Sequence, residues 1–336
     1  MNIFKPVNDV YIKGPAVYLP EKTIANKDII HYTNADVSPT VIGFSTGIRK
    51  RHWAKEDEAC SDLAIHAVKK LLDETGVQKS EIGQLILATI SGDYVSPPTS
   101  PLIQHQLDLN HIGVFDVGAA CAGFVVGLHV SAALAQSMNK DCLLIASEVR
   151  SKFLNPKDFG TSALFGDGAA ACLVTKRRQH ADFKILASGM YADGEVADLV
   201  SVPAGGSRLP AATCNDPDKH YISVKDNSAL FIKAVEGMVS AASIFLKELQ
   251  LRPEEFDWIV PHQGNKHLLT AVCSQLGIPE SKLINVVSET GNTSGASVGI
   301  ALEALKKNPS LKKGDRILLL AAGGGGIAAC SDIIFL

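Results

Sequence analysis

The chain has 336 residues, of which 46% are hydrophobic and 20% charged, and its formal net charge at pH 7 is −3. This length is sufficient for one large domain or two ordinary ones, and the composition is typical of a soluble protein. The slightly negative charge excludes a general polyanion-binding surface, so nucleic acid is not an expected partner.

Nothing in the sequence indicates a membrane or an export signal. The first residues include Lys5, Asp9 and Lys13 and lack the apolar core of a signal peptide. The longest uncharged stretch, Ile317–Ser331, is short and glycine-rich, which favours two strands joined by a glycine turn over a membrane span. The seven cysteines form no Cys-x-x-Cys pair, so we expect free thiols in the cytoplasm.

Helix and strand patterns alternate along the chain, which predicts a layered α/β fold. The first clear element is an amphipathic helix over Ser61–Gly76, with Ser61 as its cap and Gly76 as its end. Continuous apolar runs indicate strands that are covered on both faces. The further elements, in chain order, are strands over 84–90 and 141–147, a helix over 227–249, a strand over 256–261, helices over 265–279 and 296–309, and a strand over 315–321.

Two of the predicted helices have almost no polar face: the one that follows Cys121 and the one that follows Asn292. A helix that is apolar on all sides is buried on all sides. We therefore expect a middle layer of helices between two sheets.

The two halves of the chain also resemble each other. Phe165–Val174 and Gly323–Phe335 both run from glycines through Ala-Ala-Cys into an apolar strand, and each closes its half. This order predicts a duplicated unit with halves 1–176 and 177–336, joined by the charged segment 176–181.

Cys121, in the segment DVGAACAGF, is the best candidate for a nucleophile. It lies where a strand turns into a buried helix, among small residues that leave room for a substrate carbonyl. The N-terminus of a helix lowers the pKa of a thiol and favours the thiolate. The other six cysteines fit the ordinary role of buried filler.

Three further loops could complete a site. His262 follows a strand and precedes a helix, a place where open α/β folds hold ligand-handling groups. Asn292 lies in the loop SETGNTSGAS before the second buried helix, near the place that Cys121 has in its own half. Gly323–Gly326 could donate backbone N–H groups to an oxyanion. Asp167, in FGDGAA, is expected to hold a structural turn.

The chain resembles the β-ketoacyl-acyl-carrier-protein synthase III family of the thiolase superfamily. The resemblance rests on four features in this order: Cys121, His262 in PHQGN, Asn292 in GNTSGAS and the terminal glycine loop. STGIRKRHW and FGDGAAA resemble further family signatures, so the resemblance covers nearly the whole chain. It implies a five-layered αβαβα thiolase-like fold of two similar halves, a homodimer, and catalytic residues Cys121, His262 and Asn292.

The resemblance also implies a reaction. Cys121 takes an acyl group from a thioester, and the backbone N–H groups of Cys121 and Gly324 hold the oxyanion. A malonyl-type or β-ketoacyl thioester on acyl carrier protein then supplies the carbon nucleophile. His262 and Asn292 donate hydrogen bonds to the enolate oxygen. No metal or redox cofactor is required.

Several positions depart from the family pattern. Members that use a short acyl-CoA primer hold its adenine with a Trp and Arg residues, whereas this chain has Val41, Ser45 and Phe159 at those places. We therefore expect an acyl group delivered by a carrier protein or by an unusual CoA thioester.

Family members that use a short primer carry a bulky Phe that closes the acyl tunnel, in the segment that contacts the dimer partner. The nearest positions in this chain are Val95 and Ser96. Together with Ala322, they predict room for a longer or differently shaped acyl group. Lys266 and His267 follow the PHQGN motif and are the candidates for docking the carrier protein.

Three other functions compete with condensation. A degradative thiolase would need a second cysteine just before the glycine loop, where this chain has Ala321 and Ala322. An acyltransferase of the same fold could form esters or amides without decarboxylation, with acyl-Cys121 and with His262 as the base. A non-catalytic scaffold that binds acyl carrier protein would leave Cys121 unmodified.

Overall fold

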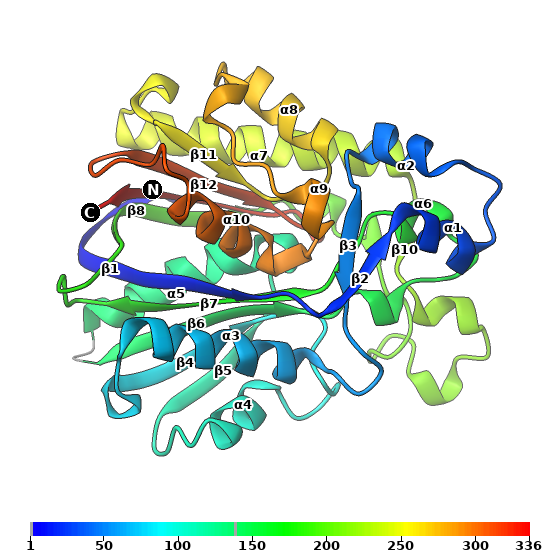
Figure 1. Ribbon diagram of the computed structural model, residues 1–336, viewed down its shortest axis with the longest axis horizontal. Helices are drawn as coiled ribbons and strands as arrows, with labels where there is room; N and C mark the ends of the chain where they lie inside the picture. The colour runs from blue at the N-terminus through cyan, green and yellow to red at the C-terminus, as the bar shows by residue number, and fades with distance from the viewer. Residues whose placement is uncertain (1–2, 138–139) are drawn as a thin grey trace.

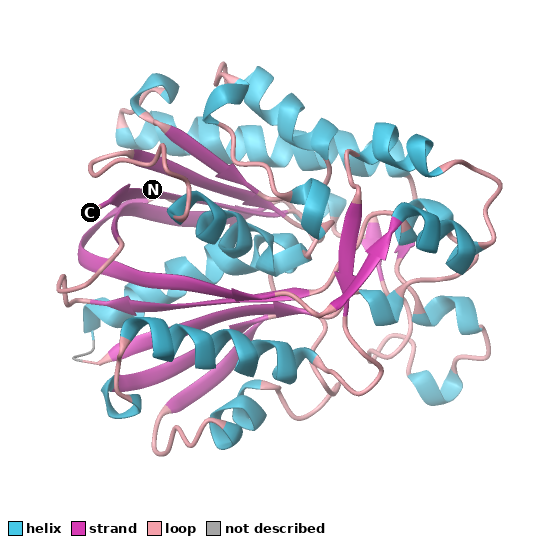
Figure 2. Ribbon diagram, in the orientation of Figure 1, coloured by secondary structure: helices cyan, strands magenta, loops and turns pink. Residues whose placement is uncertain are grey.

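The computed structural model describes residues 3–137 and 140–336 (Figures 1 and 2). Its main feature is a nine-stranded sheet that curves around two central helices. In sheet order the strands are β5 (Gly113–Val117), β4 (Ile82–Ala88), β6 (Asp141–Glu148), β7 (Gly168–Thr175), β1 (Lys5–Tyr18), β8 (Phe183–Ala192), β13 (Ile327–Phe335), β12 (Arg316–Ala322) and β11 (Trp258–Pro261).

Helices and strands form five layers, as predicted (Figure 1). The central layer is α5 (Gly123–Ser137) and α10 (Ser297–Lys306). Helix α5 contacts β4 and β6 on one side and β12 and β13 on the other, and α10 contacts β1 and β7 as well as β11 and β12. The outer layers are α3 (Cys60–Thr75) with α4 (Ser100–Gln106), and α7 (Asn227–Leu249) with α8 (Lys266–Gln275).

The strand pairings follow the same order in the two halves of the chain. β4 pairs parallel to β6, then β6–β7 and β7–β1 are antiparallel. In the second half β11 pairs parallel to β12, then β12–β13 and β13–β8 are antiparallel. The pairing of β1 with β8 joins the halves into one sheet. The predicted boundary at 176/177 lies in the link between β7 and β8.

Burial explains why the central helices are apolar. Ala120–Ser137 and α7 are both long and apolar enough to cross a membrane, yet the first lies between the two sheet layers and the second packs on β12 and β13. The first is therefore a core helix, and the second covers the sheet from an outer layer with one buried face. The central pair packs closely, since a Cβ at Gly299 would lie 2.7 Å from the Phe124 ring.

The local signals place most elements correctly. α7 has the predicted bounds, and Gly76 ends α3 with a left-handed φ of 65°. The predicted cap Ser61 is wrong, because α3 begins at Cys60 and the Asp62 carboxylate accepts a hydrogen bond from the backbone N–H of Ala59. The Ser61 hydroxyl instead donates to Asp93 at 2.6 Å.

The remaining short elements gather at one end of the layers, on the right of Figure 1. Most of them pack around a small apolar cluster that includes Ile29, Trp53 and Leu154, while α9 (Val287–Thr290) contributes to a separate cluster through Val287. This end also holds the loops that follow the parallel strands. The elements are β2 (Lys22–Ala25), α1 (Asn26–Thr33), α2 (Pro39–Thr46), β3 (Lys50–Trp53), α6 (Phe159–Ser162), β9 (Val200–Ser201), β10 (Ser223–Val224) and α9 (Val287–Thr290).

Candidate active site

The structure brings Cys121, His262 and Asn292 to the wall of one cavity, together with the loop Gly323–Gly326. The cavity has a volume of about 860 Å³ and is lined mainly by apolar groups. Each of the three residues lies at the start of a helix or directly after a strand, so the duplicated topology places them at the same end of the fold. A deep apolar cavity with a few converging polar groups is the usual form of an active site.

Cys121 lies in a tight turn between β5 and α5. The turn is a 3-10 helix over Ala120–Ala122, and Ala120 has a left-handed φ of 45°, which is strained for a residue with a side chain. The thiol is deep enough in the protein that burial raises its pKa to about 11. The expected thiolate is therefore not the resting form, because desolvation outweighs the helix N-terminus.

Three neighbours lower the pKa of Cys121 against this burial: the Ser294 hydroxyl, the charge of Arg150 and the backbone N–H of Gly324. The Gly324 N–H thus points at the sulfur, near the place of the predicted oxyanion. Gly323 must be glycine, because a Cβ there would lie 2.8 Å from the Cys121 backbone nitrogen. The glycine loop therefore allows the two backbones to approach each other.

His262 follows β11, and its side chain is 3% exposed. Its Nδ1 lies 2.7 Å from the Ser297 Oγ. The other close neighbour of that hydroxyl is the Gln263 N–H, which is a donor, so the Ser297 O–H has Nδ1 as its acceptor. This places the ring hydrogen on Nε2, the nitrogen free to face a substrate. Burial lowers the pKa of His262 to about 4, so the ring is neutral at pH 7.

Asn292 is held through both its backbone and its side chain. Its backbone bonds to Leu164 and Gly166 at 2.9 and 3.0 Å, so the FGDG segment anchors it. Its Oδ1 accepts from the Ser294 N–H at 2.9 Å, which leaves the amide NH₂ as the group that can donate into the cavity. Asn292 and His262 together offer two uncharged donors.

The other predicted site residues divide into two groups. Ala322 lines the cavity. Val95 and Ser96 are exposed and do not line it in the single chain, the Val95 side chain being 88% exposed. Lys266 and His267 are exposed in the first turn of α8, and the His267 ring bonds to the carbonyl of Phe44 at 3.1 Å.

The positions of the family's adenine contacts offer no cation. Val41 and Ser45 are exposed on α2, and Phe159 packs against the apolar cluster near Ile29. Phe159 therefore has a structural contact in place of a ligand contact.

Three residues near Cys121 were not found by sequence analysis: Glu148, Arg150 and Ser294. Glu148 ends β6, is 1% exposed, and contacts Ser91 and Ser294. A signal existed, because two charged residues follow a fully apolar strand at the edge where Cys121 also lies. The sequence places Ser294 in the same candidate loop as Asn292 but gives the serine no role of its own.

Arg150 is a buried cation at the cavity wall. Its side chain is 6% exposed, its Nε has no hydrogen-bond partner, and it forms no ion pair with any residue that the structure describes. The guanidinium lies over the rings of Phe153 and Phe165 at 5.6 and 5.8 Å. Buried charges without a partner are costly, so an anionic group of a ligand at this wall would offset that cost.

Asp167 fixes the backbone that carries Arg150. Its carboxylate accepts from the N–H groups of Ala54, Arg150 and Ser151 at 2.7–2.8 Å and from the Ser151 hydroxyl. The predicted structural role of this residue in a turn is therefore confirmed. Asp167 also positions Arg150, because its carboxylate holds the Arg150 backbone through a bond in which the Arg150 side chain takes no part.

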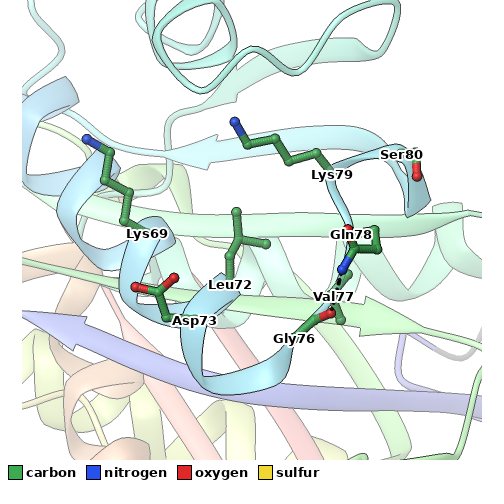
Figure 3. Close-up of a pocket in the computed structure, with 8 residues that line it drawn as sticks. All are labelled: Lys69, Leu72, Asp73, Gly76, Val77, Gln78, Lys79 and Ser80. Atoms are coloured by element: carbon green, nitrogen blue, oxygen red, sulfur yellow. Dashed lines mark hydrogen bonds between the residues drawn. The ribbon is translucent and has the colours of Figure 1, made fainter.

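A second hollow lies at the end of α3 and shares no lining residue with the Cys121 cavity (Figure 3). It is open, and Lys69 and Lys79 extend from it without meeting one another. Gln78 bonds to the backbone of Gly76 at 3.2 Å. Its charged and hydroxyl side chains are all exposed, so it lacks the buried polar groups that mark the Cys121 cavity.

A cysteine, a histidine and an asparagine between two similar halves of a five-layered fold define a condensing enzyme of the thiolase superfamily. The family model described as 3-oxoacyl-[acyl-carrier-protein] synthase III matches residues 115–194. The model described as the C-terminal part of the same enzyme matches residues 246–333. The chain belongs to the β-ketoacyl-acyl-carrier-protein synthase III family and is an acyltransferase of the condensing type.

Relatives support this assignment over nearly the whole length. The chain is 38% identical to β-ketoacyl-[acyl-carrier-protein] synthase III of Chlamydia caviae, over 96% of this chain and 95% of that one. It is 37% identical to 3-oxopimeloyl-[acyl-carrier-protein] synthase of Rhodothermus marinus, over 87% and 84%. The crystal structure of 3-oxoacyl-(acyl carrier protein) synthase III from Pseudomonas aeruginosa superposes with a TM-score of 0.88, at 30% identity over 97% and 98%.

Proposed function

We propose that the chain joins an acyl group held on Cys121 to a malonyl-type thioester on acyl carrier protein, with loss of CO₂, and that the acyl group ends in a carboxylate. Arg150 is the observation that supports the second part, because it lines the same cavity as Cys121 and is a buried cation that forms no ion pair with a described residue; the charge of Glu148 acts on it only from beyond ion-pair distance. A substrate carboxylate would supply an anionic partner through a charge-assisted hydrogen bond.

The name of one relative fits this chemistry. A 3-oxopimeloyl product is a seven-carbon β-ketoacyl group with a carboxylate at its far end. Decarboxylative condensation adds two carbons, so the acyl donor for such a product is a five-carbon chain with a terminal carboxylate, glutaryl. We therefore propose glutaryl thioester as the primer that Arg150 selects.

The positions of the side chains support the following proposed reaction. The Cys121 sulfur attacks the thioester carbonyl, and the N–H groups of Cys121 and Gly324 hold the oxyanion until the first thiol leaves. A malonyl thioester then loses CO₂, and its enolate oxygen accepts from the His262 Nε2–H and the Asn292 amide. The enolate carbon attacks the acyl-Cys121 carbonyl, which forms the new carbon–carbon bond, breaks the carbon–sulfur bond and releases the β-ketoacyl product. The Cys121 thiolate that leaves takes up one proton from water and returns to the thiol.

The proposal includes the partners expected from the sequence. Acyl carrier protein docks beside Lys266 and His267, and the enzyme is a cytoplasmic homodimer in which Val95 and Ser96 face the acyl tunnel of the second copy. No step changes an oxidation state or needs a Lewis acid, so we propose no metal or redox cofactor.

Acyl loading tests the substrate. The mass of the intact protein is followed after mixing with glutaryl-CoA, pentanoyl-CoA or acetyl-CoA, and with the same acyl groups on carrier protein. Pentanoyl has the same length without the charge. We expect glutaryl to load about 10- to 100-fold faster than pentanoyl, the range of one hydrogen-bonded charge pair. Preferred loading by acetyl-CoA would overturn the proposal.

Arg150→Leu and Arg178→Leu are the matched variants, since Arg178 is an exposed arginine. Arg150→Leu should lose the preference for glutaryl and keep or gain pentanoyl loading, whereas Arg178→Leu should behave as wild type. Release of CO₂ from malonyl thioester separates condensation from simple acyl transfer. An unmodified Cys121 with every donor would favour the scaffold.

A further inference from the structure

Glu148 is a buried carboxylate beside the nucleophile that the reaction above does not use. Its Oε2 accepts from the Ser91 hydroxyl at 2.5 Å and from the Ile90 N–H at 3.4 Å. Its Oε1 lies 3.4 Å from the Ser294 Oγ, and that oxygen lies 3.9 Å from the Cys121 Sγ. Thiol, hydroxyl and carboxylate thus stand in series.

His262 does not serve as the proton acceptor for the thiol. Its Nδ1 accepts from the Ser297 hydroxyl, so its Nε2 already carries the hydrogen that the enolate step requires. A second proton would make the ring cationic in a fully buried place, which its surroundings disfavour. The thiol proton therefore needs another destination.

The backbone holds Ser294 firmly in this series. Its φ is 48°, which is strained for serine, and its N–H donates to Asn292 Oδ1. In the other half, Ala120 has the matching φ of 45° immediately before Cys121. At matching places in the two halves, the second half therefore has the Ser294 hydroxyl and the first half has the Ala120 methyl group. The Ser294 hydroxyl lies next to Cys121, the nucleophile of the first half.

We propose that Glu148 accepts the proton of Cys121 and that Ser294 passes it between them. As the sulfur attacks the thioester, its proton moves to the Ser294 Oγ, and the proton of that hydroxyl moves to the Glu148 Oε1. When the first thiol leaves, the same path returns a proton to its sulfur and Glu148 becomes a carboxylate again. The inference rests on the proposed function only in that Cys121 is the group acylated.

The charged and titratable groups around Glu148 are Cys121, Cys60 and Arg150. Arg150 favours the carboxylate form, while burial raises the pKa of Glu148 and so favours its accepting a proton. The charge of Glu148 also raises the pKa of Cys121. If Glu148 were only a nearby charge, its removal would therefore make Cys121 more reactive, the opposite of what the relay predicts.

Alkylation by iodoacetamide tests the relay without any substrate. Rates between pH 6 and 10 are followed by intact mass in a Cys214→Ser background, because Cys214 is the other cysteine with some exposure. In the wild type we expect a rate that changes little between pH 7 and 9. In Glu148→Gln and Ser294→Ala it should rise about tenfold per pH unit and be at least ~10-fold slower at pH 7. Glu148→Asp should restore part of the plateau.

Two outcomes would overturn the relay: Glu148→Gln alkylated at pH 7 as fast as the wild type or faster, or a wild-type rate that rises tenfold per unit throughout. A folding defect is separated by a second measurement. Enzyme acylated by long incubation should release CO₂ from malonyl thioester at the same rate in wild type and Glu148→Gln, and a parallel loss there would also overturn it. Failure of glutaryl to load, with the alkylation plateau intact, would count against the substrate alone.

Discussion

One serine hydroxyl decides which nitrogen of His262 carries hydrogen. Ser297 donates to Nδ1 at 2.7 Å, so the neutral ring presents Nε2–H to the cavity. Without that hydroxyl the two tautomers become closer in energy, and the donor to the enolate is present only part of the time. In the proposed mechanism the effect belongs to the decarboxylation step, since acylation of Cys121 does not use Nε2.

Ser297→Ala should therefore lower the rate of CO₂ release from malonyl thioester about 10-fold and leave acyl loading of Cys121 unchanged. Both rates can be measured on the same protein by trapped CO₂ and intact mass. Ser131→Ala is the control, because Ser131 is also buried on a central helix but its hydroxyl has no partner among the described residues. Equal losses in both half-reactions would contradict the tautomer argument.

The lowered pKa of His262 also links stability to pH. Its pKa is about 4 in the folded protein, against an ordinary value of 6.5, so below pH 6.5 the unfolded chain binds a proton that the folded chain does not. This contribution to stability is fully present above pH 6.5 and is lost as the pH falls toward 4. Between pH 7 and 5 it amounts to about 2 kcal/mol.

Urea unfolding at pH 7 and pH 5 measures that loss. The difference between the two pH values should be about 2 kcal/mol smaller in His262→Gln than in the wild type. Other carboxylates and histidines contribute equally to both proteins and cancel. The same difference in both proteins would show that the ring is protonated in the folded state.

At the scale of elements, the glycine loop between β12 and β13 decides how closely the second half approaches the nucleophile. A Cβ at Gly323 would lie 2.8 Å from the Cys121 nitrogen and 2.9 Å from the Ala119 carbonyl. Both neighbours are backbone, so neither can move away without disturbing the turn that holds Cys121.

Gly323→Ala should consequently lower the rate of Cys121 acylation by about 100-fold or more, the scale of losing one oxyanion donor. Gly206→Ala is the control, because a Cβ there meets nothing within 4 Å. Thermal unfolding should show both variants folded. Acylation of Gly323→Ala at the wild-type rate would show that the loop is not part of the oxyanion site.

Some helices and site residues can be predicted from the sequence alone, because their signals are local. Periodicity and end signals predicted the bounds of α7 and the end of α3, because these depend on neighbouring residues. Cys121, His262 and Asn292 were found from short segments at strand–helix junctions. Glu148 and Ser294 are 146 residues apart and meet only when the halves pack, so no local pattern could join them.

At the scale of the whole molecule, one edge of the sheet exposes apolar side chains. Phe115 on the edge strand β5 is 37% exposed, and Tyr94 and Val95 in the preceding loop are 63% and 88% exposed. Exposed apolar side chains that gather in one patch mark a protein interface. The proposed homodimer would cover it.

Light scattering should give a mass in solution of twice the 35.6 kDa chain. Val95→Asp should shift the protein toward the monomer and reduce loading of long acyl groups, since Val95 then leaves the second copy's tunnel. Ile232→Asp is a comparable change on α7, where Ile232 is 51% exposed, and it should keep the wild-type mass. A wild-type monomer at micromolar concentration would rule the dimer out.

Asp167 has a consequence for how this chain can change over evolutionary time. Its carboxylate holds the backbone at Arg150 and Ser151 through bonds that do not involve the guanidinium. In the proposed function, replacing that one side chain would alter which primer fits while these backbone bonds stay in place. Selectivity would then be a separable trait, which a single substitution at this position could change within the same architecture.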